Sequence, residues 1–230
     1  MDLQSARRFL AAHGWLSLTS PEFIDAVIAR CILRTFDRGD ALYRLDDDRS
    51  GLVGIASGSV GMELTLPDQQ PFMGDILLPG SWVGAASLLT RQNRRVGIHA
   101  TRPTEALFLT GADFNTISAR IPEAIRWIGV LAVQQQDRAV RAAVDLMIRD
   151  PRRRAVAVLL RLAGLLGPTS EGAKEIDINQ EQLALLANLS RSTLNSLLRD
   201  LEAAGLIIQS YRKIAIVDGA ALKRRMQSKS

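Results

Sequence analysis

Residues 178–201 read INQEQLALLANLSRSTLNSLLRDL and predict two short helices joined by a tight turn. Asn179 is suited to cap the first helix, with Gln182 three residues later as its capping-box partner. Asn188 falls where the chain must turn, and asparagine tolerates the left-handed conformation that a sharp turn needs. Ser190 is suited to cap the second helix. The buried stripe of that helix is predicted from helical spacing to be Leu194, Leu197, Leu198 and Leu201.

The opposite face of the second helix carries hydrogen-bonding side chains and few acids, which is typical of a helix-turn-helix whose second helix enters the major groove of DNA. Arg191 is suited to pair with a guanine edge, whereas Thr193 and Arg199 suit phosphates. The short polar residues that suit base edges or water bridges are Ser192, Asn195 and Ser196. The alternative is an ordinary helical hairpin with a solvated polar face.

The residues after this motif favour DNA binding over the plain hairpin. Gly205 stands where the second helix should end. Residues 206–208 and 214–217 are two apolar runs, which we interpret as strands on either side of a basic turn over residues 209–213. Such a hairpin is the wing of a winged helix, with Arg212 and Lys213 at its tip near a phosphate backbone.

Charge is concentrated in the same part of the chain. The 230 residues carry a net charge of +5. Residues 1–146 hold 15 basic and 16 acidic side chains, whereas residues 147–230 hold 14 and 8, so their net charges are −1 and +6. A basic excess beside the predicted DNA reader is the expected electrostatic footprint. A basic tail kept for solubility would explain residues 223–229 but not Arg191, Arg199, Arg212 and Lys213.

Composition excludes several classes of protein. The hydrophobic fraction of 47% supports packed cores. No apolar run reaches the roughly 20 residues of a membrane span, and residues 1–13 lack the apolar centre of a signal peptide. One cysteine, Cys31, excludes an internal disulfide and a cysteine-ligated cluster or zinc site. These features predict a cytoplasmic protein without a metal site.

The first half of the chain predicts a small β structure behind two short helices. Residues 3–13 and 20–31 are suited to helices, the second with Ser20 as cap and Pro21 in the first turn. Glycines then recur between short apolar segments, which indicates about eight strands in an antiparallel sandwich or roll. The segments are 41–45, 52–56, 60–66, 72–78, 96–100 and 106–109. A short helix over 111–120 follows.

A long helix is predicted from about Pro122 to Ile148. Apolar and small residues repeat in steps of three and four along it, as in a coiled-coil seam between two copies of the chain. The seam residues are Ile125, Ile128, Ala132, Gln135, Ala139, Ala142 and Leu146. The alternative is a long helix packed on its own β domain. Asp150-Pro151 breaks the helix, with Asp150 as a cap. We then expect a helix over 152–166, a loop over 164–172 and a short strand over 175–178.

A glycine-rich roll, a long helix, a capped break and a winged helix-turn-helix, in this order, resemble the Crp/Fnr family of bacterial transcription regulators. In the first domain the resemblance depends on Arg38-Gly39-Asp40, on Ser57-Gly58-Ser59-Val60 and on residues 79–84, PGSWVG. It implies an α+β protein with an antiparallel β-roll of the cupin-like, cyclic-nucleotide-binding fold over residues 1–120. It also implies a dimerisation helix over 121–149 and a winged helix-turn-helix over 150–230. The implied partners are a second copy, a palindromic site on double-stranded DNA and RNA polymerase.

The effector site departs from the pattern of cyclic-AMP-binding relatives. The glutamate that grips the ribose there corresponds to Ala85, after Gly84, and the adenine contacts of the long helix correspond to Ala139 and Val140. The phosphate-binding arginine corresponds to Arg94, followed by Arg95. A ribose without its acceptor loses about 1–3 kcal/mol, so we expect that cyclic AMP is not the effector. Arg91, Arg94 and Arg95 either hold another anion or form a solvated loop. The iron–sulfur branch of the family needs cysteines that this chain lacks.

Two other functions compete with a DNA-binding regulator. A cupin-like metalloenzyme needs a cluster of ligands, and His13 and His99 are far apart in the sequence. No Walker loop, Ser/His/Asp grouping or Cys/His pair is present, so the sequence predicts that the protein is not an enzyme. A small-molecule sensor that acts through protein partners is the second alternative, and the basic C-terminal half speaks against it.

Overall fold

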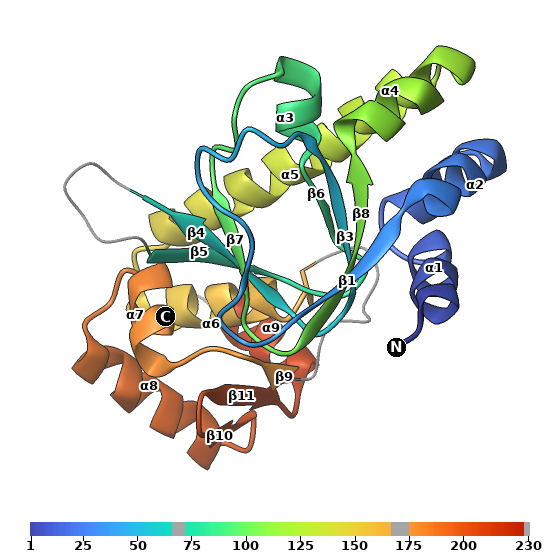
Figure 1. The fold of residues 1–230 in the computed structure, drawn as a ribbon. Coiled ribbons are helices and arrows are strands. Elements are labelled where there is room, and N and C mark those ends of the chain that lie inside the picture. Colours follow the sequence, from blue (N-terminus) through green and yellow to red (C-terminus); the bar gives the residue numbers. More distant parts are fainter. Residues whose placement is uncertain (66–71, 167–174, 228–230) are drawn as a thin grey trace. The chain divides into compact units, whose positions relative to one another are not determined.

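The computed structural model describes residues 1–65, 72–166 and 175–227. The chain divides into two compact units, Met1–Asp137 and Arg138–Ser230. Each unit has its own antiparallel sheet structure and helices, and together they form the α+β fold that the sequence predicts (Figure 1). Within the described residues, no helix is both long and apolar enough to cross a membrane.

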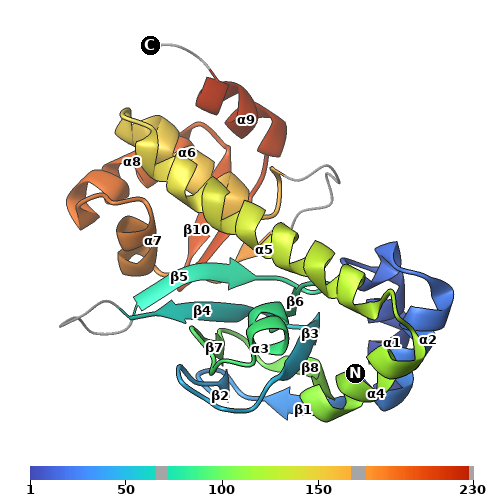
Figure 2. The same cartoon turned by 90° about the horizontal axis from the view of Figure 1, so that it is seen from above.

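The N-terminal unit is a β-roll of two four-stranded antiparallel sheets, which lie over one another in Figures 1 and 2. One sheet has the order β1-β8-β3-β6 and the other β2-β7-β4-β5. The strands are β1 Ile32–Phe36, β2 Ala41–Tyr43, β3 Gly51–Ser57, β4 Val60–Leu64, β5 Phe72–Leu77, β6 Trp82–Val83, β7 Gly97–Ala100 and β8 Thr104–Thr110. The sequence indicated most of these strands. It missed β1, which pairs with β8, and it missed the two-residue β6, which pairs with β3. Leu66, in the predicted strand 60–66, lies outside the described residues.

Strand β3 explains how the roll is built, because both of its faces are buried. Val53 and Ile55 face the core between the two sheets, whereas Leu52 and Ala56 face a second core under the helices. A continuous apolar run is typical of a strand covered on both sides. Gly54 is required by close approach, since a Cβ there would lie 2.7 Å from the indole of Trp82.

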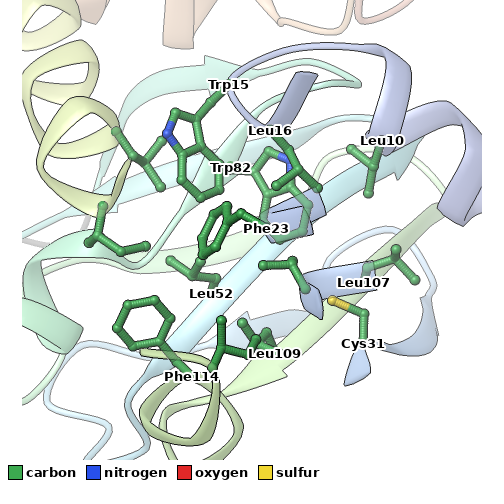
Figure 3. Packing of buried hydrophobic residues seen from close by; sticks show 14 of the residues in the cluster. Leu10, Trp15, Leu16, Phe23, Cys31, Leu52, Trp82, Leu107, Leu109 and Phe114 are labelled. Carbon is green, nitrogen blue, oxygen red and sulfur yellow. The ribbon is translucent and has the colours of Figure 1, made fainter. Parts of the chain in front are cut away.

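The second core joins the helices of the N-terminal unit to the outer face of one sheet (Figure 3). Trp15 packs edge-on against Phe23 and Trp82, with ring centroids 6.0 and 5.8 Å apart. Side-chain caps begin all of these helices except Ala85–Thr90, as at Ser20, whose hydroxyl accepts a hydrogen bond from the Phe23 amide. The helices are α1 Leu3–Ala12, α2 Pro21–Arg30, α3 Ala85–Thr90 and α4 Gly111–Arg120, with a 3-10 turn at Leu16–Leu18. The sequence did not predict α3.

The long helix α5, Ala124–Met147, confirms the predicted length, and it removes Ile128 from the predicted seam. Ile128 is fully buried in the core of its own unit, and Ala132 packs against that core. The Gln135 amide donates a hydrogen bond to the carbonyl oxygen of Trp82 at 3.1 Å. These residues are therefore committed to the roll, as in the alternative interpretation, and Ile128 in particular is not available to a second chain. The remaining predicted positions, Ile125, Ala139, Ala142 and Leu146, are exposed or half-buried.

The C-terminal unit holds the second half of α5 and a winged helix-turn-helix. Its elements are α6 Pro151–Leu162, β9 Glu175–Ile176, α7 Gln180–Leu186, α8 Arg191–Ala203, β10 Ile207–Ser210, β11 Lys213–Ile216 and α9 Gly219–Gln227, and its sheet has the order β10-β11-β9. Asp150 caps α6 by accepting from the Arg153 amide, as predicted. The helix ends four residues earlier than predicted because Gly164 adopts a φ of +72° just after it. Most of the predicted loop 164–172 lies outside the described residues.

Helix α9 holds most of the residues that the alternative of a basic tail would explain. Asp218 begins it by accepting a hydrogen bond from the Ala221 amide, and Leu222 is fully buried. The guanidinium of Arg153 in α6 donates to the carbonyl oxygen of Met226 at 2.8 Å. The basic residues up to position 227 thus belong to a packed helix, whereas Lys229 lies outside the described residues.

Candidate nucleic-acid interface

The helix-turn-helix forms as its sequence predicts because each junction is fixed by a local hydrogen bond. The Asn179 side chain accepts from the Gln182 amide at 2.7 Å, and the Gln182 side chain accepts from the Asn179 amide at 3.1 Å. Asn188 makes the turn with a φ of 48°. Ser190 accepts from the Thr193 amide at 3.1 Å and begins α8. Neutral caps of this kind stabilise a helix by about 1 kcal/mol each.

Arg154 supports the turn, and no sequence pattern pointed to this role. Its guanidinium donates to the carbonyl oxygens of Ala187, Asn188 and Ile148, at 2.6, 3.2 and 2.7 Å. The last carbonyls of a helix have no partner within the helix. Arg154 therefore binds α6 to the end of α7 and to the turn, which fixes where α8 starts.

Helix α8 presents the polar face that the sequence predicted. Leu194, Leu197, Leu198 and Leu201 are buried. Arg191 and Arg199 are exposed and Asn195 is half-buried. The structure also exposes Ser192, Thr193 and Ser196. The hydroxyls of the first two lie 3.0 and 2.7 Å from that of Ser190, so the first turn of α8 is a hydrogen-bonded cluster of three hydroxyls.

The wing is a hairpin with a two-residue turn. Strands β10 and β11 pair from Ile207 with Ile216 to Ser210 with Lys213, which leaves Tyr211 and Arg212 at the tip. Tyr211 is 88% exposed. Arg212 has a φ of 57°, a conformation that glycine adopts at much lower cost. The ammonium of Lys213 lies 3.3 Å from the carboxylate of Glu175 on β9, so this cation is already paired at the surface.

A cleft of about 420 Å³ separates the helix-turn-helix from the wing. Asn179 and Gln180 line it at the start of α7, and Arg191 lines it at the start of α8. Arg212 and Lys213 line it from the wing. The structure therefore brings together cations from both predicted contact regions around one open, polar groove, which suits an anionic strand.

The predicted effector residues lie together in the N-terminal unit, around a smaller cavity of about 200 Å³. Gly84 and Arg94 line it with apolar neighbours such as Met62 and Val83. Ala85 is fully buried in the first turn of α3, whereas Arg95 is exposed and also lines the cavity.

Arg94 is buried and bound by its own chain. Its guanidinium donates to the carbonyl oxygens of Arg49 and Gly51 at 3.1 and 2.9 Å, and lies 4.2 Å from the ring centre of Tyr43. Its second terminal nitrogen, Nη1, is buried without a hydrogen-bond partner. Burial lowers the pKa of Arg94, with Tyr43 and Asp47 acting in the opposite direction. Burial raises the pKa of the Tyr43 phenol to about 12, so this ring faces the cation as a neutral group.

The fold and the interface define a winged helix-turn-helix DNA-binding protein with a β-roll domain. The family model for the Crp-like helix-turn-helix domain matches residues 153–225, and the model for the cyclic nucleotide-binding domain matches residues 33–120. The chain belongs to the Crp/Fnr family and is a DNA-binding transcription regulator of that type.

Two similar proteins and one solved structure support the assignment to this family. The chain is 25% identical, over 94% of its length and 97% of the relative, to a CRP-like cAMP-activated global transcriptional regulator of Mycobacterium tuberculosis. It is 26% identical to the cyclic AMP receptor protein of Thermus thermophilus, over 89% of this chain and 92% of that protein. A solved structure of a CRP-family transcriptional regulator, also from Thermus thermophilus, matches with a TM-score of 0.65 and 25% identity, over 85% and 97% of the two chains.

Proposed function

We propose that the chain regulates transcription as a homodimer on a palindromic promoter site, with one α8 helix of each copy in the major groove. The exposed polar face of α8 and the cationic cleft beside the wing support this assignment. In the proposal Arg191 reads a base edge, assisted by Ser192, Asn195 and Ser196, while Thr193, Arg199, Arg212 and Lys213 bind phosphates. RNA polymerase is the implied protein partner, and such a regulator acts in the cytoplasm beside the chromosome. The proposal assigns no catalytic step to the chain.

Selection of genomic DNA fragments by the purified protein tests this function. We expect enrichment of fragments that share a two-fold symmetric sequence, and binding that weakens steeply with salt. Arg191→Ala should remove about 1–3 kcal/mol of discrimination at one base pair of each half-site while keeping most non-specific affinity. Full selectivity in this variant would refute the assignment of Arg191, and enrichment of no DNA would refute the function.

The proposed dimer uses the exposed stripe of α5 in place of the seam that the sequence suggested. Val133, Val140, Val144 and Met147 are 53–80% exposed and follow one another in steps of seven, four and three. Such steps place apolar side chains on one face of a helix, where a second copy covers them in a coiled coil. Val140→Glu should convert a dimer into a monomer in analytical ultracentrifugation, whereas Gln134→Glu should not. A monomeric wild type would contradict the proposal.

We further propose that cyclic AMP is not the effector and that the roll responds to another small molecule. The side chain of Ala85 offers no acceptor to a ribose hydroxyl. The 200 Å³ cavity is also smaller than the roughly 300–1,000 Å³ of sites for drug-sized ligands. Isothermal titration with cyclic AMP should give no binding in the micromolar range, and tight binding would contradict this part of the proposal.

A further inference from the structure

Three polar side chains connect the elements that surround the cleft. Glu202, near the end of α8, accepts hydrogen bonds from Gln209 twice, from the backbone amide at 2.6 Å and from the side-chain amide at 2.9 Å. The side-chain oxygen of Gln209 in turn accepts from the side-chain amide of Gln180 at 3.1 Å. Gln180 is the first residue of α7, and Gln209 lies on β10 of the wing.

We call the hydrogen-bonded side chains of Gln180, Gln209 and Glu202 the relay. The charge of Glu202 decides which group donates and which accepts at each hydrogen bond. An ionised carboxylate only accepts hydrogen bonds, so the nitrogen of the Gln209 amide must face Glu202. The oxygen of the same amide is then left to face Gln180. Hydrogen bonds to a charged acceptor are about twice as strong as those between neutral groups, so the bond to Glu202 is the firmer one. All three side chains are half-buried, which limits the competition from water.

The relay acts where the wing needs support. Gln209 stands two residues before Tyr211, so a fixed Gln209 also fixes the tip with Arg212 and the first residue of β11, Lys213. A two-stranded hairpin is marginally stable by itself, and here β9 adds a pairing of two residues on the far side of β11. Gln180 and Gln209 also line the cleft, whereas Glu202 holds Gln209 from outside it. The relay therefore ties both walls of the cleft to the recognition helix.

We propose that Gln209 is a positioning residue, which through Glu202 and Gln180 holds the wing at the distance from α8 that lets both bind one DNA segment. The inference rests on the proposed DNA-binding role of the cleft. Gln209 itself reads no base. Gln209 instead sets the number of phosphates that the wing contacts while α8 occupies the groove.

An exchange of donor and acceptor tests the relay. Gln209→Glu places two carboxylates against each other, and Glu202→Gln replaces one of the two acceptor oxygens by a donor. In the double variant the new amide at position 202 can donate to the new carboxylate at 209, which still accepts from Gln180. Each single variant should weaken binding to a fluorescent random-sequence duplex about tenfold, because a hydrogen bond to a charged group is lost. The double variant should recover the affinity of the wild type.

The salt dependence separates positioning from stability. Loss of a wing contact should lower the slope of log affinity against log salt by about 0.9 for each phosphate released. A purely structural role would lower the thermal stability of the singles and leave the slope unchanged, which would overturn the inference. Gln227→Glu on α9 adds the same charge as Gln209→Glu outside the relay and should keep the wild-type slope.

A long-range charge effect predicts a different pattern. It would make Glu202→Gln bind DNA more tightly than the wild type, and that result would overturn the inference. If Gln209→Glu does not fold, the variants Glu202→Gln and Gln180→Leu test the inference in its place. Gln180→Leu should lower DNA affinity about threefold, because one neutral hydrogen bond is lost. Failure of the wild type to bind any duplex would refute the proposed function instead, before the relay is tested.

Discussion

The two units of this protein bury an arginine in opposite ways. In the C-terminal unit Arg161 of α6 meets the carboxylate of Asp145 on α5 at 2.7 Å, with both side chains at most 7% exposed. In the N-terminal unit Arg94 meets two backbone carbonyls and an aromatic ring, and the described residues contain no ion pair for it. Arg161 pairs with a carboxylate inside a helix pair, whereas Arg94 brings a positive charge beside a cavity and is held there by neutral groups.

The difference separates a structural arginine from one that is suited to a ligand. A buried ion pair fixes the packing of two elements, since either charge is costly without the other. A buried cation beside a cavity remains able to attract an anion. The arginines of α8 and the wing form a third group, exposed to solvent and suited to phosphates. Four substitutions test these distinctions.

The largest effect is expected at the ion pair. Arg161→Met removes the guanidinium that meets the buried carboxylate of Asp145 and should lower the free energy of unfolding by about 3–5 kcal/mol. The double variant with Asp145→Leu should cost less than this single change, because the buried carboxylate is then removed together with the guanidinium. Urea denaturation followed by circular dichroism measures both. If the free energy of unfolding of Arg161→Met falls by less than about 1 kcal/mol, the ion pair has no structural role.

A smaller loss is expected at Arg94. Arg94→Met strands no carboxylate but leaves the carbonyl oxygens of Arg49 and Gly51 without this donor, at a cost of about 1–3 kcal/mol. The same denaturation experiment applies. A loss of unfolding free energy equal to that of Arg161→Met would show that the two buried arginines have the same structural role.

A substitution at the tip of the wing should raise the stability of the fold and weaken DNA binding. Arg212→Gly relieves the positive φ and should stabilise the fold by up to about 1 kcal/mol. The same change removes a phosphate contact and should reduce the salt slope of DNA binding by about 0.9 per copy. Thermal unfolding and a salt titration give the two values. A variant with unchanged DNA affinity would exclude Arg212 from the interface.

The smallest effect is expected beside Lys213. Glu175→Gln releases this cation from a surface ion pair and removes a negative charge near the cleft. Surface pairs are worth about 0–1 kcal/mol, so DNA affinity should rise by no more than about fivefold. Fluorescence anisotropy at low salt measures the change. Weaker binding would indicate that Glu175 supports the wing and does not compete with phosphate.

The sequence predicted the C-terminal unit in more detail than the N-terminal one, because its signals are local. Asn179, Asn188, Ser190 and Gly205 mark helix ends by their own conformational preferences and caps. The relay through Gln209 was missed, since it joins residues 29 positions apart that no spacing rule connects.

The long helix shows why periodicity alone was insufficient. Steps of three and four select one face of a helix but do not say what covers it. Ile128 and Gln135 face the roll of their own chain, and the exposed valines lie on another face. The role of Arg94 was open for a similar reason, because its carbonyl partners, Arg49 and Gly51, lie 45 and 43 residues earlier in the chain. Tertiary contacts of this kind decide the outcome, and the sequence carries no local mark of them.

Photocrosslinking from α8 tests the central claim most directly. A photoreactive residue in place of Ser196 should crosslink to a base within the bound DNA, whereas the same residue in place of the exposed Leu18 should not. Bound DNA that crosslinks from position 18 and never from position 196 would contradict the account of α8 as the helix that reads the groove.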